Sequence, residues 1–210
     1  MKVKGALALG GALSLACLVH VARSQMTSGS RIAEIGKPLP AGVTAPEVNF
    51  EDLAEKAGLT GRNVSGSEKQ QSWIVENTGT GLAVFDYDNA GLPDILLVNA
   101  DRFEPGRGKV NHFLYHNLGN LKFEDVTAKS GITHDGWGQG ACAGDFDNDG
   151  LVDVFITNWG QNQLFHNLGG GKFRNEAKER GVDGEPGRWS TGCSFFDYDR
   201  DGYLDLMVAH

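Results

Sequence analysis

A nine-residue acidic loop, present in three copies, constrains this chain more than any other feature. The second copy begins at Asp145 and reads Asp-Phe-Asp-Asn-Asp-Gly-Leu-Val-Asp, and the third begins at Asp197 and reads Asp-Tyr-Asp-Arg-Asp-Gly-Tyr-Leu-Asp. The first copy, from Asp86, has Ala90 at position 5. Acidic side chains at positions 1, 3, 5 and 9 around a glycine can converge on one cation. The pattern therefore predicts a repeat protein that carries metal sites.

The chemistry of the loop favours calcium, which takes about six to eight oxygen ligands in a forgiving geometry. An EF-hand is excluded because position 12 is Ile156 or Val208, where an EF-hand needs a bidentate Glu. A solvated acidic turn is the alternative, since Asp, Asn and Gly are common in turns, but the repetition disfavours it. The predicted calcium ligands are the Asp side chains and the position 7 carbonyls: Asp86, Asp88, Leu92, Asp94, Asp145, Asp147, Asp149, Leu151, Asp153, Asp197, Asp199, Asp201, Tyr203 and Asp205.

The repeat is larger than the loop. The three loops start 59 and 52 residues apart, and His116-Asn-Leu-Gly recurs 50 residues later as His166-Asn-Leu-Gly. Apolar runs predict four short strands in the first unit, at 81–85, 94–99, 112–115 and 121–126. Four strands in a period of this length are typical of a β-propeller blade, whereas parallel β-helix repeats are shorter. We therefore predict an all-β fold, a partial β-propeller of about two and a half four-stranded blades.

A segment near the start of the chain resembles the end of each unit. Residues 50–59, Phe-Glu-Asp-Leu-Ala-Glu-Lys-Ala-Gly-Leu, match 123–132 and 173–182. The segment predicts a lone outer strand at Phe50, of the kind that completes the last blade of a propeller. Because about two and a half blades cannot close a ring, we expect the chain to be part of a longer protein.

These motifs resemble the FG-GAP or VCBS-type repeats of integrin α-subunit propellers. Residues 74–88 and the His-Asn-Leu-Gly pieces are more closely similar to the cartilage acidic protein family and its bacterial relatives. The resemblance implies a secretion signal, a seven-bladed calcium-binding propeller and usually a further C-terminal domain. Two departures from the family pattern are Ala90, which weakens the first metal site, and the end of the chain at His210.

The first 24 residues have the pattern of a signal peptide, with Lys2 and Lys4 ahead of a mostly apolar stretch. Residues 25–47 are predicted to be a linker and 48–210 the propeller domain. We expect a secreted, periplasmic or cell-surface protein with no membrane span after signal cleavage. The formal net charge of −8 reflects the acidic loops, and no basic run indicates nucleic-acid binding.

Two cysteines of the predicted domain, Cys142 and Cys193, lie on the strands that enter the second and third loops. We interpret them as small apolar core residues, with a disulfide between adjacent blades as the alternative. His116 and His166 recur at one repeat position, so we interpret them as structural hydrogen-bonding groups.

The function predicted from these features is binding rather than catalysis. We see no nucleophile elbow, zinc signature or phosphate loop, and predict no catalytic residue. Trp137 and Trp189 each lie eight residues before a loop, where an aromatic rim could stack on a ligand, or simply pack between blades. We expect a calcium-stabilised propeller whose partner is an extracellular protein or a glycan. A carbohydrate-active enzyme with its catalytic groups in further blades and an architectural matrix or cell-surface module remain the alternatives.

Overall fold

The apolar runs form strands in a computed structural model, which describes residues 50–67, 71–103 and 110–210. The predicted signal peptide and linker, together with residues 48–49, lie outside the described residues. The elements below all belong to one compact unit, Glu51–His210. Among the described residues, no helix has the length and apolar character needed to cross a membrane.

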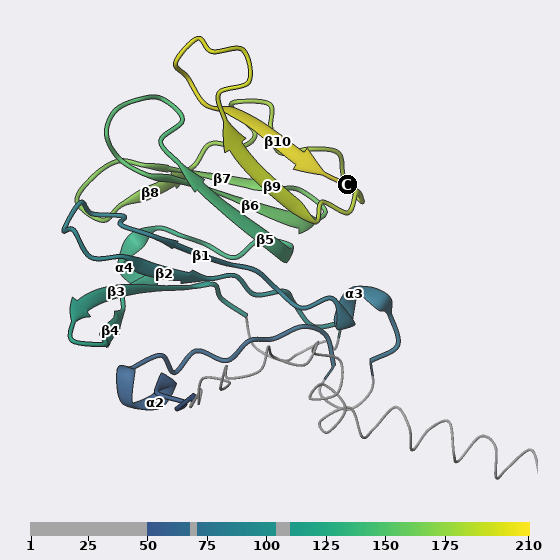
Figure 1. The fold of residues 1–210 in the computed structure, drawn as a ribbon. Helices are drawn as coiled ribbons and strands as arrows, with labels where there is room; N and C mark the ends of the chain where they lie inside the picture. Colours follow the sequence, from purple (N-terminus) through teal and green to yellow (C-terminus); the bar gives the residue numbers. More distant parts are fainter. Residues whose placement is uncertain (1–49, 68–70, 104–109) are drawn as a thin grey trace, which may run out of the picture. The chain divides into compact units, whose positions relative to one another are not determined.

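Ten strands in the described part of the chain form three antiparallel sheets, each in sequence order (Figure 1). The first sheet contains β1 (Leu82–Phe85), β2 (Asp94–Leu97), β3 (Phe113–Gly119) and β4 (Lys122–Asp125). The second contains β5 (Trp137–Gly144), β6 (Asp153–Trp159), β7 (Gln163–Asn167) and β8 (Phe173–Asn175). The third contains β9 (Gly192–Phe196) and β10 (Asp205–Ala209).

The first strands of successive sheets lie beside one another, β1 against β5 and β5 against β9. This is the arrangement of propeller blades around an axis, and it requires close backbone approach. A Cβ added at Gly81 would lie 2.7 Å from the Cα of Gly140 on the next blade. The prediction of an all-β, propeller-type fold is confirmed, although the described strands form no closed ring.

The core lies between the blades, because β6 is buried on both faces. Val154 and Ile156 join a cluster with the first sheet. Phe155, between them in sequence, points the other way into a cluster with the third sheet. The continuous apolar run after the second acidic loop thus reflects a strand with a neighbour on each face. Truncating a fully buried Phe such as Phe155 to Ala typically costs about 3–5 kcal/mol.

Three short helices accompany the described strands: α2 (Ala54–Ala57), α3 (Ile74–Asn77) and α4 (Thr127–Ser130). Gly58 and Gly131 end α2 and α4 with φ of 89° and 84°. At each, an added Cβ would lie 2.5 Å from a carbonyl oxygen on the fourth strand of a neighbouring repeat, at Phe123 or Phe173. Helices α2 and α4 therefore each dock on the blade that follows them.

The prediction of a strand at Phe50 is wrong. Residues 50–53 form no strand, and the segment's likeness to the later repeats is carried by α2 and Gly58. The physical reason is that an outer strand needs the third strand of its own blade as a hydrogen-bonding partner. In the first two sheets β3 and β7 fill that role for β4 and β8.

The interpretation of the cysteines as unpaired core residues is also wrong. Cys142 on β5 and Cys193 on β9 form a disulfide, with their Cα atoms 5.8 Å apart. The bond joins the inner strands of two blades across 51 residues of chain. In the chain-entropy description, a loop of that length gains about 4 kcal/mol of stability.

A buried histidine joins the ends of the first two blades. The main-chain N–H of Asn99 donates to Nδ1 of His112 at 3.0 Å, and the His112 ring packs edge-on against His134. Burial, reinforced by the nearby imidazole of His134, lowers the pKa of His112 to about 3. His112 therefore stays neutral in the folded protein well below the ordinary histidine pKa of about 6.5.

This depressed pKa makes stability depend on pH. Below about pH 6.5, His112 becomes protonated in the unfolded chain but stays neutral in the folded protein until about pH 3. The unfolded state therefore binds more protons, and the free energy of unfolding falls as the pH drops. The slope for one proton is at most about 1.4 kcal/mol per pH unit. We expect His112→Asn, which keeps an acceptor for Asn99, to flatten the urea-unfolding profile between pH 6.5 and 4. His210→Asn at the exposed C-terminus is the control, and equal slopes in all three proteins would contradict the prediction.

Candidate metal centres

The three acidic loops connect the first and second strands of their sheets and share one backbone shape. In each sheet the residue before the loop pairs with the Asp at position 9, as Phe85 does with Asp94. The residues at positions 4 and 6 all have positive φ: Asn89, Asn148 and Arg200 at 58–66°, and Gly91, Gly150 and Gly202 at 80–91°. The shared dihedral pattern confirms that the loops are structural repeats.

The Asp at position 1 closes each loop through the main chain. In the second loop, the two carboxylate oxygens of Asp145 accept the N–H groups of Asp149 at 3.2 Å and Gly150 at 2.9 Å. The third loop repeats this arrangement around Asp197. These bonds hold the loop in a curl that turns the neighbouring side chains inward.

The Asp at position 9 ties the loop to the rest of its blade. Asp153 is fully buried, and its carboxylate accepts the N–H of Phe146 in the loop at 3.1 Å. The other oxygen accepts the N–H of Asn167 in the His-Asn-Leu-Gly turn at 2.8 Å. Asp94 makes the same two bonds in the first blade, to Tyr87 and Asn117. One buried carboxylate thus fixes both repeated motifs.

Burial disfavours the charged form of these carboxylates. It raises the pKa of Asp94, and it raises that of Asp153 to about 6, although main-chain N–H groups oppose the shift. The nearby carboxylates of Asp88 and Asp147 add to the effect. A cation among these groups would reverse the balance, because it favours ionised carboxylates.

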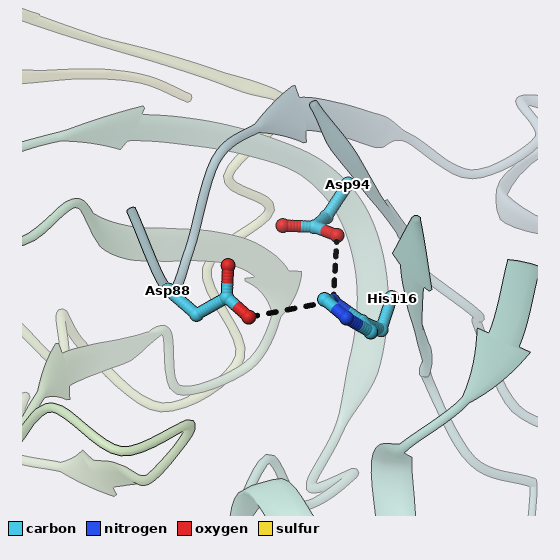
Figure 2. A group of neighbouring side chains, drawn as sticks. All are labelled: Asp88, Asp94 and His116. Carbon is cyan, nitrogen blue, oxygen red and sulfur yellow. Dashed lines mark ion pairs between the residues drawn. The ribbon is translucent and has the colours of Figure 1, made fainter. Parts of the chain in front are cut away.

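The predicted ligands converge to different degrees in the three loops. Positions 1, 3 and 9 bring their oxygens within 4.8 Å of one another in two loops: Asp145, Asp147 and Asp153, and Asp197, Asp199 and Asp205. Asp149, at position 5, groups with Asp147 and His166. In the first loop, Asp88 and Asp94 group with His116 rather than with Asp86 (Figure 2).

The remaining predicted ligands lie outside these groups. Asp86 accepts the N–H groups of Ala90 and Gly91, and Asp201 accepts the N–H of Tyr203 at 2.8 Å. The position 7 residues, Leu92, Leu151 and Tyr203, were predicted to act through main-chain carbonyls, and their role stays a prediction.

Two histidines are the residues that the sequence did not connect to the metal loops. His166 Nε2 lies 3.1 Å from Asp147 Oδ2, and its Nδ1 lies 2.9 Å from Oε1 of the buried Glu176. Burial lowers the pKa of His166, but the hydrogen bond and charge of Glu176 outweigh it, so the pKa rises overall. The only sequence signal for this role was that a histidine recurs before each Asn-Leu-Gly turn. That recurrence does not indicate that the side chain faces the acidic loop.

Adjacent loops are joined by the Asn at position 4. Asn89 Nδ2 donates to the carbonyl of Gly150 in the second loop at 2.9 Å. Asn148 Nδ2 donates to the carbonyl of Gly202 in the third loop at 2.7 Å. We call these two bonds the asparagine clasps. They make the shape of each loop depend on the next blade.

The predicted aromatic rim lies at the opposite end of the strands from the acidic loops, since Trp137 begins β5 and Gly144 ends it. Trp137 is only 4% exposed and stacks on Phe103 with ring centroids 4.5 Å apart. Trp189 is half-buried against it. Packing between blades therefore accounts for Trp137, whereas Trp189 reaches the surface.

An apolar groove opens beside these tryptophans, with a volume of about 460 Å³. It is lined by Trp73, Ile74, Val75, Phe103, Trp159 and Trp189. Trp73, Ile74, Phe103 and Trp159 are each at least 40% exposed. Large exposed apolar patches are uncommon on proteins that bind nothing. Of the two tryptophans that the sequence selected, Trp189 lines this groove, whereas Trp137 is buried and does not.

Comparison with known proteins agrees with the repeat structure. A family model described as FG-GAP-like repeat matches residues 86–156 and 145–208. Cartilage acidic protein 1 of Mus musculus and that of Homo sapiens are each 31% identical over 142 residues, which is 65% of this chain and 20% of theirs. The Xenopus tropicalis protein of that name is 31% identical over 141 residues. The chain thus spans about a fifth of the length of the curated relatives it matches.

The asparagine clasps generate a test that does not depend on the metal. We expect Asn148→Ala to lower the free energy of unfolding by about 1 kcal/mol through loss of the bond to Gly202, beyond the strain that a non-glycine residue meets at positive φ. Asn120→Ala measures that strain, because Asn120 has a similar φ of 52° in the turn between β3 and β4. Urea unfolding in excess EGTA compares the two, and equal losses would show that the clasp contributes nothing.

Proposed function

Because the chain belongs to the FG-GAP-like repeat family, we propose that it forms part of a secreted propeller module that binds calcium and recognises an extracellular partner. The observation that carries the proposal is the convergence of position 1, 3 and 9 carboxylates within 4.8 Å in the second and third loops. We infer a binding module rather than an enzyme.

The donor set fits calcium. The side chains that converge in the third loop are all carboxylates, the hard oxygen ligands that calcium prefers: Asp197, Asp199 and Asp205. In the second loop, Asp145, Asp147 and Asp153 would hold the ion, and His166 belongs to a separate group with Asp147 and Asp149. A bound cation would neutralise these carboxylates and fix the turn between the first two strands of each blade.

Export is supported by two features. The disulfide between Cys142 and Cys193 suits an oxidising compartment, because such bonds are rare in the cytosol of most organisms. The predicted signal peptide in residues 1–24 points the same way. The name of the relatives refers to cartilage, and for this chain we infer an extracellular or periplasmic location.

The groove favours a protein partner over a glycan. Its six lining side chains are aromatic or aliphatic, and their only polar atoms are indole N–H groups. The indole nitrogen of Trp189 is itself buried. A sugar needs polar groups for its hydroxyls beside a stacking ring, whereas an apolar side chain of a protein needs only a dry pocket. We therefore assign the groove to an apolar or aromatic anchor of a protein.

Calcium should stabilise the fold. At about 100 times its Kd, a ligand that binds only the folded state adds about 2.7 kcal/mol. For a domain of this size that corresponds to a rise in Tm of about 5–10 °C. We expect that rise for the full chain in millimolar calcium relative to EGTA, and a smaller one for Asp199→Asn. Asp135→Asn, an exposed carboxylate outside the loops, should behave as the unmodified protein. An unchanged Tm in calcium would contradict a structural role for the ion.

The groove can be tested with a displayed library of random peptides. We expect selected peptides to carry Trp, Phe or Leu anchors, and Trp159→Ala to weaken their binding at least about tenfold, as loss of a central anchor does. Leu118→Ala removes a comparably exposed apolar side chain elsewhere and should have no effect. If a glycan array gives ligands that depend on Trp159 and the peptide library gives none, the partner is a glycan.

A further inference from the structure

In the first blade an imidazole groups with the buried carboxylate at position 9, Asp94, and with Asp88, whereas His166 in the second blade groups with Asp147 and Asp149. His116 Nδ1 lies 3.2 Å from Asp94 Oδ1 and 3.5 Å from Asp88 Oδ2. Figure 2 shows the two carboxylates turned toward the same edge of the ring. The three side chains come from the acidic loop, the start of β2 and the middle of β3. We call them the first-blade triad.

The imidazole nitrogen that faces the carboxylates is buried and makes no hydrogen bond of acceptable geometry. Asp94 is 1% exposed, and its two oxygens accept main-chain N–H groups from Asn117 and Tyr87. Those bonds fix the carboxylate and still leave lone pairs free on Oδ1. A shared cation would satisfy all three ligand atoms at once.

The separations suit a small tetrahedral ion. Ligands held about 2.0–2.1 Å from zinc lie about 3.3 Å from one another in a tetrahedron. The two nitrogen–oxygen distances in the triad, 3.2 and 3.5 Å, bracket that value. Three protein ligands would leave a fourth position for water.

The second blade shows why the two histidines differ. There Nδ1 of His166 lies 2.9 Å from Oε1 of Glu176. This ion pair fixes the orientation of the ring on the side away from the acidic loop. The residue of the first blade that matches Glu176 in the repeat is Val126. Without that acid, Nδ1 of His116 turns toward the loop carboxylates.

The first loop also offers calcium less than the others do. Ala90 stands at position 5, where the later loops have Asp149 and Asp201. Calcium prefers an all-oxygen shell, whereas imidazole nitrogen suits borderline ions such as zinc. The loss of the position 5 carboxylate, with the imidazole nitrogen of His116 facing Asp88 and Asp94, therefore shifts the preferred metal.

We propose that the first blade binds a divalent transition-metal ion of the zinc class through Asp88, Asp94 and His116, while the second and third loops take calcium. The inference rests on the proposed function only in treating all three loops as cation sites. Zinc binding at the first blade and calcium binding at the others are measured separately, so either can fail alone.

The test is zinc titration of the full chain by calorimetry in millimolar calcium. We expect about one zinc ion per chain that calcium does not displace, and at least about 100-fold weaker binding in His116→Asn, a larger loss than removal of a residue that only orients a ligand. His166→Asn is the matched control and should keep the site. Retained zinc binding in His116→Asn, or no zinc binding in the unmodified protein, would overturn the proposal.

Cobalt gives a readout that needs no variant. We expect the unmodified protein in millimolar calcium to give the intense visible absorption of tetrahedral cobalt, and zinc to abolish it. A weak octahedral spectrum, or displacement by calcium, counts against the triad. Ala90→Asp should raise calcium affinity at the first loop and weaken its preference for zinc. The proposed calcium role fails separately, through an unchanged Tm in calcium.

Discussion

A buried carboxylate organises each complete blade. Asp94 and Asp153 begin the second strand, and each accepts one N–H from the acidic loop and one from the His-Asn-Leu-Gly turn. Unsatisfied buried donors would cost about 1–3 kcal/mol each, so neither motif can move without the other. The two motifs recur together because they share this acceptor. Burial fixes this carboxylate in place, but it also imposes a desolvation penalty on its charged form. A nearby cation would offset that penalty.

The links between blades are arranged around this anchor. At the loop end, the asparagine clasps pass from one blade to the next. On the inner strands, the disulfide joins β5 to β9. At the far end, Trp137 is buried among residues of three segments. Stiffness at the loop end and along the inner strands leaves the far end free to present exposed aromatic side chains.

Much of the fold was predictable from the sequence because the signals were local. Each apolar run after an acidic loop became a strand, buried in β2 and β6 and largely exposed in β10, and the glycine of each loop took positive φ. The failures came from non-local information. Phe50 has the sequence of an outer strand but forms none, and Cys142 meets Cys193 only after the blades stack. Periodicity cannot reveal which side chains face each other across two blades.

The divergence of the two histidines illustrates this limit most clearly. His116 and His166 occupy the same place in their repeats, beside identical Asn-Leu-Gly turns. Their surroundings differ through a residue on the segment after the fourth strand, Val126 in one blade and Glu176 in the other. Glu176 is further held by Arg174 and Arg180, and although burial opposes it, these bonds lower the pKa of Glu176 to about 2. A backbone repeated from blade to blade can thus carry an ion pair in one blade and a candidate metal ligand in the next. The repeat pattern predicts where a side chain lies in its blade. The chemical role of that side chain depends on the neighbouring residues, which differ from one blade to the next.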